Sequence, residues 1–110
     1  MRTVVPGDLI AAAQVLQLVP PDCRKSTADR IVANAHAADQ FRKRLGRAHE
    51  IWGNGTLAAA VFRMQHATGN PLETKEGTEA ALAMVAALSR WRARAALDPA
   101  FSLLYGAGSG

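Results

Sequence analysis

The chain has 110 residues, of which 49% are hydrophobic, 5% aromatic and 20% charged, and its formal net charge at pH 7 is +4. This length suits one domain with a modest core, and the apolar share is normal for a globular protein. The single cysteine excludes a disulfide within the chain. No segment approaches the roughly 20 apolar residues that are needed to span a bilayer.

Alanine supplies much of the apolar content, and its high helix propensity favours helices. A first helix is predicted to begin at Asp8, whose carboxylate can accept hydrogen bonds from free amides of the first turn, and to end at the proline pair 20–21. A second helix begins at the second of these prolines or, alternatively, at Ser26. It ends at Leu45, where Gly46 caps its C-terminus.

Two further helices are predicted in the second half of the chain. Thr56 caps a third helix over residues 57–68, which ends at Gly69. A polar connection then leads to Thr78, which caps a fourth helix that runs to about Ala96.

No segment alternates apolar and polar residues with the period of a strand. Four helices with short connections predict an all-α fold, a compact four-helix domain over residues 1–98 with a short apolar C-terminal segment and tail over 99–110. Polar and helix-breaking residues interrupt the apolar start of the chain, and no small-x-small cleavage site follows, so no signal peptide is predicted. The expectation is a cytoplasmic protein without a membrane partner.

The stretch GRAHEIWGNGTL at residues 46–57 concentrates glycines, a histidine and a tryptophan between two alanine-rich segments. In one interpretation it is a corner in which Ile51 and Trp52 fold inward and plug the end of the bundle. In the other, His49 and Trp52 are exposed as a binding loop. We favour the plug, because an exposed tryptophan and isoleucine are costly in a small domain, and we expect Trp52 to be largely buried against the third or fourth helix.

The same stretch, together with the start TVVPGDLIAAA, resembles small uncharacterised bacterial proteins that share a pattern like RAHxxWGNGxL after a long helix. The resemblance covers about the first sixty residues. It implies a helical, cytoplasmic protein, and it assigns no activity and no role to any residue.

Isolated chemical groups are present, but no convergent set of them forms a catalytic motif. His36 and Asp39 lie three residues apart on one helical face, a spacing that suits two metal ligands, but no second pair of matching spacing occurs. Cys23 lies beside Arg24 and Lys25, and we expect it to be a small apolar filler. No metal, no cofactor and no catalytic residue is therefore predicted, and an enzyme with a site near His49 is the third hypothesis.

Basic residues cluster in RKRLGR at 42–47 and in RWRAR at 90–94. Trp91 continues the apolar face of the fourth helix, so it is predicted to belong to the core. A nucleic-acid-binding protein that uses these basic helix ends is the second hypothesis. Its candidate phosphate contacts are Arg42, Lys43, Arg44 and Arg47.

The first hypothesis is a non-enzymatic protein-interaction or accessory module that forms a homodimer or docks on a helical partner. Four large apolar residues fall within five positions after the helix-breaking Asp98-Pro99 pair, and we expect this segment to take part in the association. The segment contains Phe101, Leu103, Leu104 and Tyr105, and the candidate partner-binding residues are His49, Trp52, Phe101, Leu104 and Tyr105.

Overall fold

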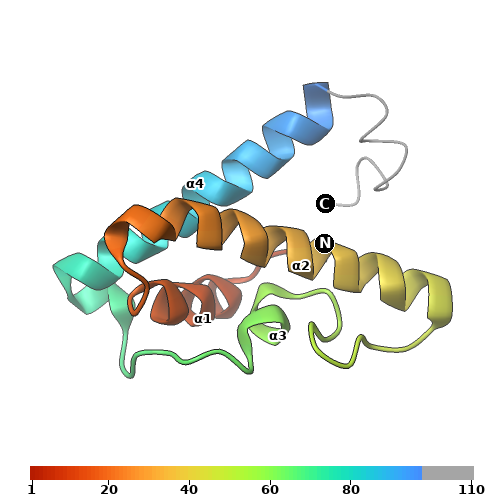
Figure 1. The fold of residues 1–110 in the computed structure, drawn as a ribbon, viewed down its shortest axis with the longest axis horizontal. Coiled ribbons are helices and arrows are strands. Elements are labelled where there is room, and N and C mark those ends of the chain that lie inside the picture. Colours follow the sequence, from red (N-terminus) through yellow and green to blue (C-terminus); the bar gives the residue numbers. More distant parts are fainter. Residues whose placement is uncertain (98–110) are drawn as a thin grey trace.

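The computed structural model describes residues 1–97, and these residues form an all-α fold (Figure 1). Four α-helices and two short 3-10 helices follow one another, and the described residues contain no strand, which confirms the predicted fold class. The predicted association segment with Phe101, Leu103, Leu104 and Tyr105 lies outside the described residues. In chain order the elements are α1 (Pro6–Leu16), η1 (Pro21–Cys23), α2 (Arg24–Leu45), α3 (Leu57–Val61), η2 (Pro71–Glu73) and α4 (Lys75–Leu97).

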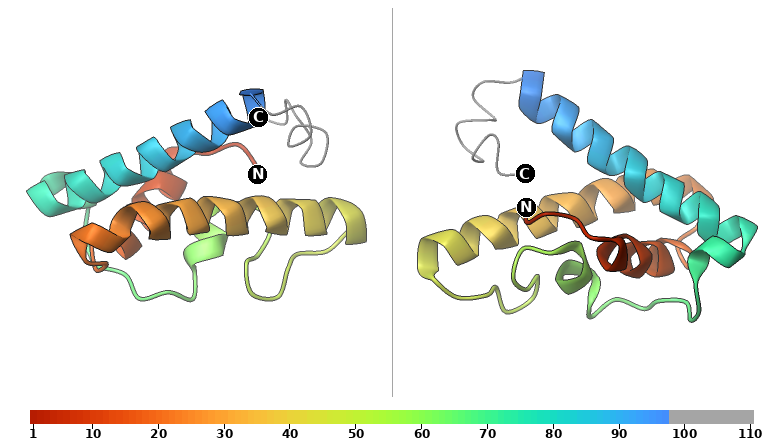
Figure 2. Two further views of the ribbon diagram at one scale, coloured as in Figure 1. Left: turned by 45° about the horizontal axis from the view of Figure 1, so that its top comes forward. Right: turned by 180° about the vertical axis from the view of Figure 1, so that it is seen from behind.

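The two long helices α2 and α4 run in the same general direction, and their axes diverge toward their C-terminal ends (Figures 1 and 2). α1 packs against both α3 and α4, and the core lies where these helices meet α2. Many of its side chains are alanines, which let the helix axes approach closely. The core cluster consists of Ala12, Ala13, Val15, Leu16, Ala28, Ile31, Val32, Ala35, Leu57, Val61, Ala80, Ala81, Met84, Ala87 and Leu88.

α1 begins at Pro6, before the predicted position, with Val5 as its N-cap. The sequence predicted that Asp8 caps the helix, but Asp8 is the third residue of the helix. Its Oδ2 accepts a hydrogen bond from the Val5 amide at 3.1 Å, and its Oδ1 accepts one from the Ala58 amide at 3.1 Å. The carboxylate thus ties the start of α1 to the start of α3.

α2 ends at Leu45, as predicted. Gly46 caps this end: it adopts a left-handed conformation with φ 72°, and its amide donates to the Arg42 carbonyl at 2.8 Å. The helix starts at Arg24, between the two predicted starts. Cys23, which precedes it, is exposed. The expectation that Cys23 is an apolar filler is therefore wrong.

α3 ends at Val61 and is much shorter than the predicted helix over 57–68. Residues after Phe62 follow α1 instead: the Ala67 amide donates to the Gln14 carbonyl at 2.9 Å, and the Gln14 side-chain amide donates to the Gly69 carbonyl at 2.8 Å. These contacts with a distant helix replace the hydrogen bonds that a longer α3 would have made. Local helix propensity is overridden by tertiary contacts.

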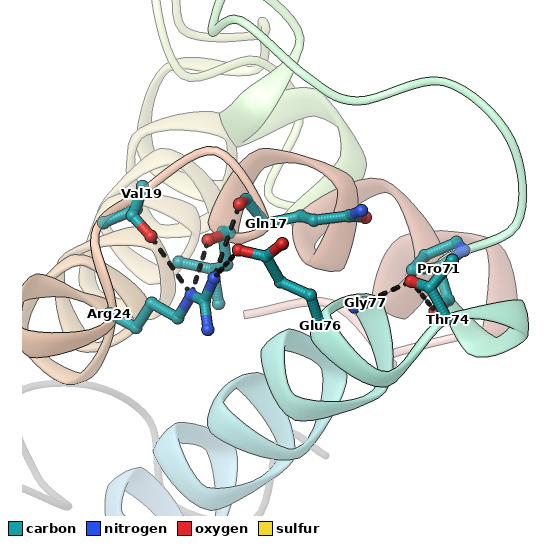
Figure 3. Close-up of polar contacts among 8 residues, drawn as sticks. Gln17, Val19, Arg24, Pro71, Thr74, Glu76 and Gly77 are labelled. Atoms are coloured by element: carbon teal, nitrogen blue, oxygen red, sulfur yellow. Dashed lines mark hydrogen bonds and ion pairs between the residues drawn. The ribbon is translucent and has the colours of Figure 1, made fainter.

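α4 begins at Lys75, three residues before the predicted cap Thr78, because Thr74 caps it. The Thr74 hydroxyl accepts a hydrogen bond from the Gly77 amide at 3.0 Å (Figure 3). A β-carbon at Gly77 would collide with the backbone of Pro71, so only glycine allows η2 to lie this close to α4. The helix continues to Leu97, close to the predicted end.

A buried arginine joins the start of α2 to the end of α1 and to α4 (Figure 3). The Arg24 Nε donates hydrogen bonds to the carbonyl oxygens of Leu16 at 3.0 Å and Val19 at 3.1 Å. Its Nη2 lies 2.8 Å from the Glu76 carboxylate and 3.4 Å from the Gln17 carbonyl. The guanidinium thereby holds together the turn that follows α1, where the Leu16 carbonyl also accepts a hydrogen bond from the Val19 amide at 3.0 Å.

Within residues 1–97, no helix is long and apolar enough to cross a membrane.

Candidate functional site

The loop after α2 closes into a tight turn around His49. The backbones of His49 and Gly53 exchange two hydrogen bonds, of 2.8 Å and 3.0 Å. Inside the turn, the His49 Nδ1 accepts hydrogen bonds from the amides of Ile51 and Trp52, both at 3.1 Å. An imidazole nitrogen that accepts two backbone N–H groups stabilises the turn, so this nitrogen has a structural role.

Aromatic rings gather where this turn meets α2. The rings of His49 and Trp52 are stacked with centroids 4.6 Å apart, and the rings of Phe41 and His49 form a T-shaped pair with centroids 4.9 Å apart. The Arg47 guanidinium lies 5.3 Å from the Phe41 centroid, on the ring face. Ile51 is 57% exposed, so the inward plug is wrong for this residue.

Trp52 is partly buried, and it is not among the residues that pack against the core cluster. Its ring lies on His49, which belongs to the same loop. Its burial against the third or fourth helix stays a prediction. His49 and Trp52 remain candidate partner-binding residues only as a prediction.

Replacing Trp52 with alanine is expected to lower the free energy of unfolding by about 1–2 kcal/mol, less than the 3–5 kcal/mol typical of a fully buried aromatic residue. The loss comes from one stacked ring at the surface of the fold. Urea denaturation followed by circular dichroism measures it, with Trp52→Phe as the control that retains a ring. A loss above about 3 kcal/mol would show that Trp52 is part of the core.

The second half of the loop docks on α2 through a glycine. Gly55 has φ +98°, and a β-carbon there would lie 2.7 Å from the Asp39 β-carbon, so both its backbone angle and its neighbour require glycine. Asn54 Oδ1 accepts a hydrogen bond from the Thr56 amide at 3.2 Å. The Thr56 hydroxyl in turn accepts one from the Ala59 amide at 3.1 Å, which confirms the predicted cap of α3.

Asp39 lies under this loop, and its side chain is only 2% exposed. Its Oδ2 lies 3.2 Å from the Met1 ammonium nitrogen and 3.1 Å from Lys43 Nζ, and its Oδ1 lies 3.1 Å from Arg42 Nη2. The ammonium also lies 2.7 Å from His36 Nδ1, which must accept because an ammonium has no lone pair. The carboxylate is thus surrounded by three cations.

The surroundings shift the ionisation of this cluster. Burial alone would raise the pKa of Asp39, but hydrogen bonds from Lys43, Arg42 and the Met1 ammonium outweigh it and lower the pKa to about 2. Burial lowers the pKa of the Met1 ammonium below 8.0, although Asp39 acts in the opposite direction. The cluster therefore keeps Asp39 ionised over the whole physiological range.

These contacts change how the predicted residues are interpreted. His36 and Asp39 do share one face, as the sequence predicted, but they face the Met1 ammonium. Among residues 1–97, no group of three or more histidine, cysteine, aspartate or glutamate side chains is arranged to hold a metal ion. Two of the candidate phosphate contacts, Arg42 and Lys43, form ion pairs with Asp39, whereas Arg44 and Arg47 are exposed.

A pocket of about 450 Å³ lies between α2 and α4. Its size is in the range of ligand-binding pockets. Arg90 crosses it and pairs with Asp29, through distances of 2.8 Å and 3.2 Å from Nη2 and Nε to the same carboxylate oxygen. The pocket is lined by Asp29, Arg30, Val32 and Ala33 from α2 and by Ala87, Arg90, Trp91 and Arg94 from α4.

Over residues 2–88, the chain matches the family described as Domain of unknown function (DUF7742). The protein belongs to this family. No curated protein and no solved structure matches the chain.

The two candidate regions of this DUF7742 protein differ in how much of each the family match covers. The loop at 46–57, Asp39 and the α2 wall of the pocket all lie within the matched residues. On the α4 wall only Ala87 does, while Arg90, Trp91 and Arg94 follow the matched region.

Four apolar and four charged residues line the pocket. Trp91 packs against the core cluster, as predicted, and it also forms part of the pocket wall. The centroids of the Trp91 and His36 rings are 5.1 Å apart. The sequence indicated the basic cluster at 90–94 but not the pocket. No pattern in the sequence indicates that these parts of α2 and α4 face each other.

Proposed function

We propose that this DUF7742 protein is a non-enzymatic protein-interaction module. The pocket between α2 and α4, which we call the groove, would hold an acidic, partly apolar segment of a partner protein. The composition of the groove carries this proposal: three arginines and one aspartate line it together with four apolar residues. Apolar contact supplies affinity, and charge complementarity supplies orientation and specificity.

The charge balance of the residues that line the groove supports an acidic occupant. Asp29 forms its ion pair with Arg90, so the pair contributes little net charge. Arg30 adds an exposed positive charge from α2, and Arg94 lines the α4 side of the pocket. A carboxylate placed between the two helices would face cations from both sides. Guanidinium groups are well suited to bind carboxylates, because they donate two parallel hydrogen bonds.

Nucleic acid is the second candidate, because the same arginines lie beside Trp91, on which a base could stack. Nucleic-acid binding usually needs a continuous basic surface that follows the phosphate backbone. In this protein the densest basic cluster is partly neutralised, since Asp39 pairs with Arg42 and Lys43. The geometry therefore favours a protein segment, and an oligonucleotide becomes one arm of the test.

The sequence offers an intrinsic probe of the groove. The chain has two tryptophans, and Trp52→Phe leaves Trp91 as the sole one. We expect a 12-residue helical peptide of alternating leucine and glutamate pairs to shift the Trp91 emission with a micromolar midpoint. The same peptide with glutamine in place of glutamate, and a 12-nucleotide single-stranded DNA, are the two comparison ligands.

Charge-removing variants locate the binding. Arg30→Gln and Arg94→Gln are each expected to weaken peptide binding at least fivefold. Arg63→Gln, which removes an exposed arginine outside the groove, serves as the matched control and is expected to leave binding unchanged. Tighter binding of the DNA than of the acidic peptide would replace the proposal with nucleic-acid recognition. No shift with any ligand would remove the groove as a binding site.

A further inference from the structure

The groove contains a carboxylate of its own. Among the described residues, Asp29 is the only acidic side chain that lines it. Arg90 Nη2 and Nε donate to the same oxygen of Asp29, at 2.8 Å and 3.2 Å. Asp29 comes from α2 and Arg90 from α4, so the ion pair bridges the groove. The Asp29 carboxylate therefore occupies the place on Arg90 where a carboxylate of an acidic ligand would bind.

We propose that Asp29 competes with the partner for Arg90. When the acidic segment enters the groove, one of its carboxylates replaces the Asp29 carboxylate on the guanidinium. No covalent bond changes in this step, because one ion pair is exchanged for another. The inference rests on the proposed function, since it takes an acidic segment as the ligand. It assigns to Asp29 the role of limiting how tightly and how selectively the groove binds.

The geometry of the pair favours the exchange. A guanidinium binds a carboxylate best through two parallel hydrogen bonds, one to each oxygen. Both Arg90 donors instead meet a single oxygen of Asp29. An incoming carboxylate is not held by the backbone of α2, so it can turn to offer both oxygens. The exchange thus replaces a contact through one oxygen by a contact through two.

Water reaches both partners of the ion pair, so breaking it costs little. The side chain of Arg90 is 39% exposed and that of Asp29 is 46% exposed. Once released, the Asp29 carboxylate is solvated. Lys25 is also exposed and lies one helical turn before Asp29 on α2, a spacing at which the two side chains can pair. The energy of such an exposed pair is small, so Asp29 is a weak competitor that a well-placed ligand can displace.

This competition makes the groove selective for carboxylates that bring apolar contacts with them. Asp29 is tethered beside Arg90 and therefore acts at a high effective concentration, which a small free anion does not match. A segment that also packs on Ala33 and Trp91 delivers its carboxylate to Arg90 with additional binding energy. We therefore expect acetate at millimolar concentration to leave peptide binding unchanged.

Removing the Asp29 charge tests the exchange, with the leucine–glutamate peptide as ligand and Trp91 emission as the signal in the Trp52→Phe chain. Asp29→Asn should tighten peptide binding about fivefold, the factor that corresponds to ~1 kcal/mol, the upper value for an exposed ion pair. The amidated glutamine peptide should gain nothing, because it has no carboxylate for Arg90.

Asp22→Asn is the matched control for charge. It removes the same charge from an exposed aspartate outside the groove. Because salt screens a distant exposed charge, the Kd should stay within about twofold of the parent value. Circular dichroism of each variant confirms that the helical fold is retained.

A double variant locates the gain at Arg90. Asp29→Asn combined with Arg90→Gln has the same formal charge as the parent chain, but it lacks the guanidinium that the exchange frees. It should therefore bind no more tightly than the parent. A gain that persisted in the double variant would show that Asp29 acts by repulsion alone, and it would overturn the exchange.

The outcomes separate this inference from the proposed function. Binding by the parent that Asp29→Asn does not tighten would overturn the exchange and leave the groove as a binding site. If neither chain bound the peptide, the groove would be removed as a binding site and the exchange with it.

Discussion

Replacing Asp39 with alanine is expected to lower the free energy of unfolding by about 3–4 kcal/mol, the range for breaking a buried charge cluster by removing one partner. The variant leaves the Met1 ammonium, Arg42 and Lys43 gathered around an apolar methyl group. Alanine retains the Cβ and Cα of Asp39, the atoms that lie nearest to Gly55, so the loss reports mainly on the charge cluster. Urea denaturation of the variant and the parent chain measures the difference.

Lys43→Ala is the matched control for this loss. It removes one cation of the same cluster, but its side chain is exposed and water can take over part of the contact. We expect Lys43→Ala to cost at most about 1 kcal/mol, the usual upper value for an exposed ion pair. If both variants lost the same amount, the buried position of Asp39 would not be the cause.

The dependence of stability on pH gives an independent measurement of the same cluster. The pKa of Asp39 is lowered from 3.8 to about 2 in the fold, so the ionised form is favoured there. The stabilisation is complete above pH 4 and is lost as the pH falls through about 2. Each pKa unit corresponds to about 1.4 kcal/mol, which gives about 2 kcal/mol in total. Asp39→Asn should lack this part of the pH dependence, and an unchanged profile would contradict the assignment.

Helix ends could be predicted from the sequence where the capping chemistry is local. Gly46 ends α2 and Thr56 starts α3 through contacts within a few residues, so composition and spacing were sufficient. The end of α3 was not predictable in this way. It depends on Gln14, which holds residues more than fifty positions away in the sequence. No pattern within the third helix records that contact.

The candidate sites show the same division. The spacing of His36 and Asp39 correctly placed them on one face, and it suggested a pair of metal ligands. Their actual partner, the Met1 ammonium, comes from a distant part of the chain. Met1 is 35 residues from His36 in the chain, and Gly55 reaches Asp39 only because the loop folds back. The groove likewise depends on how α2 and α4 cross, which local periodicity does not determine.

Arg24 is the clearest residue whose role only the tertiary structure reveals, and its replacement by alanine is expected to cost about 3–5 kcal/mol. In the sequence it was only a basic neighbour of Cys23. In the fold it is buried and donates to the carbonyls of Leu16 and Val19, which close the end of α1. Because hydrogen bonds from a charged donor contribute more than neutral ones, losing both at a buried helix end is severe.

Two comparison variants separate the carbonyl contacts from the ion pair. Glu76 is 61% exposed, so Glu76→Gln should cost less than about 1 kcal/mol even though the Arg24 guanidinium lies 2.8 Å from the carboxylate. Arg24→Lys keeps the charge but loses the planar arrangement of donors, and it should retain less than half of the stabilisation. Urea denaturation of the three variants ranks them. Equal losses of unfolding free energy in Arg24→Ala and Glu76→Gln would assign the stabilisation to the ion pair. A large loss in both Arg24 variants but not in Glu76→Gln would assign it to the contacts with the carbonyls at the end of α1.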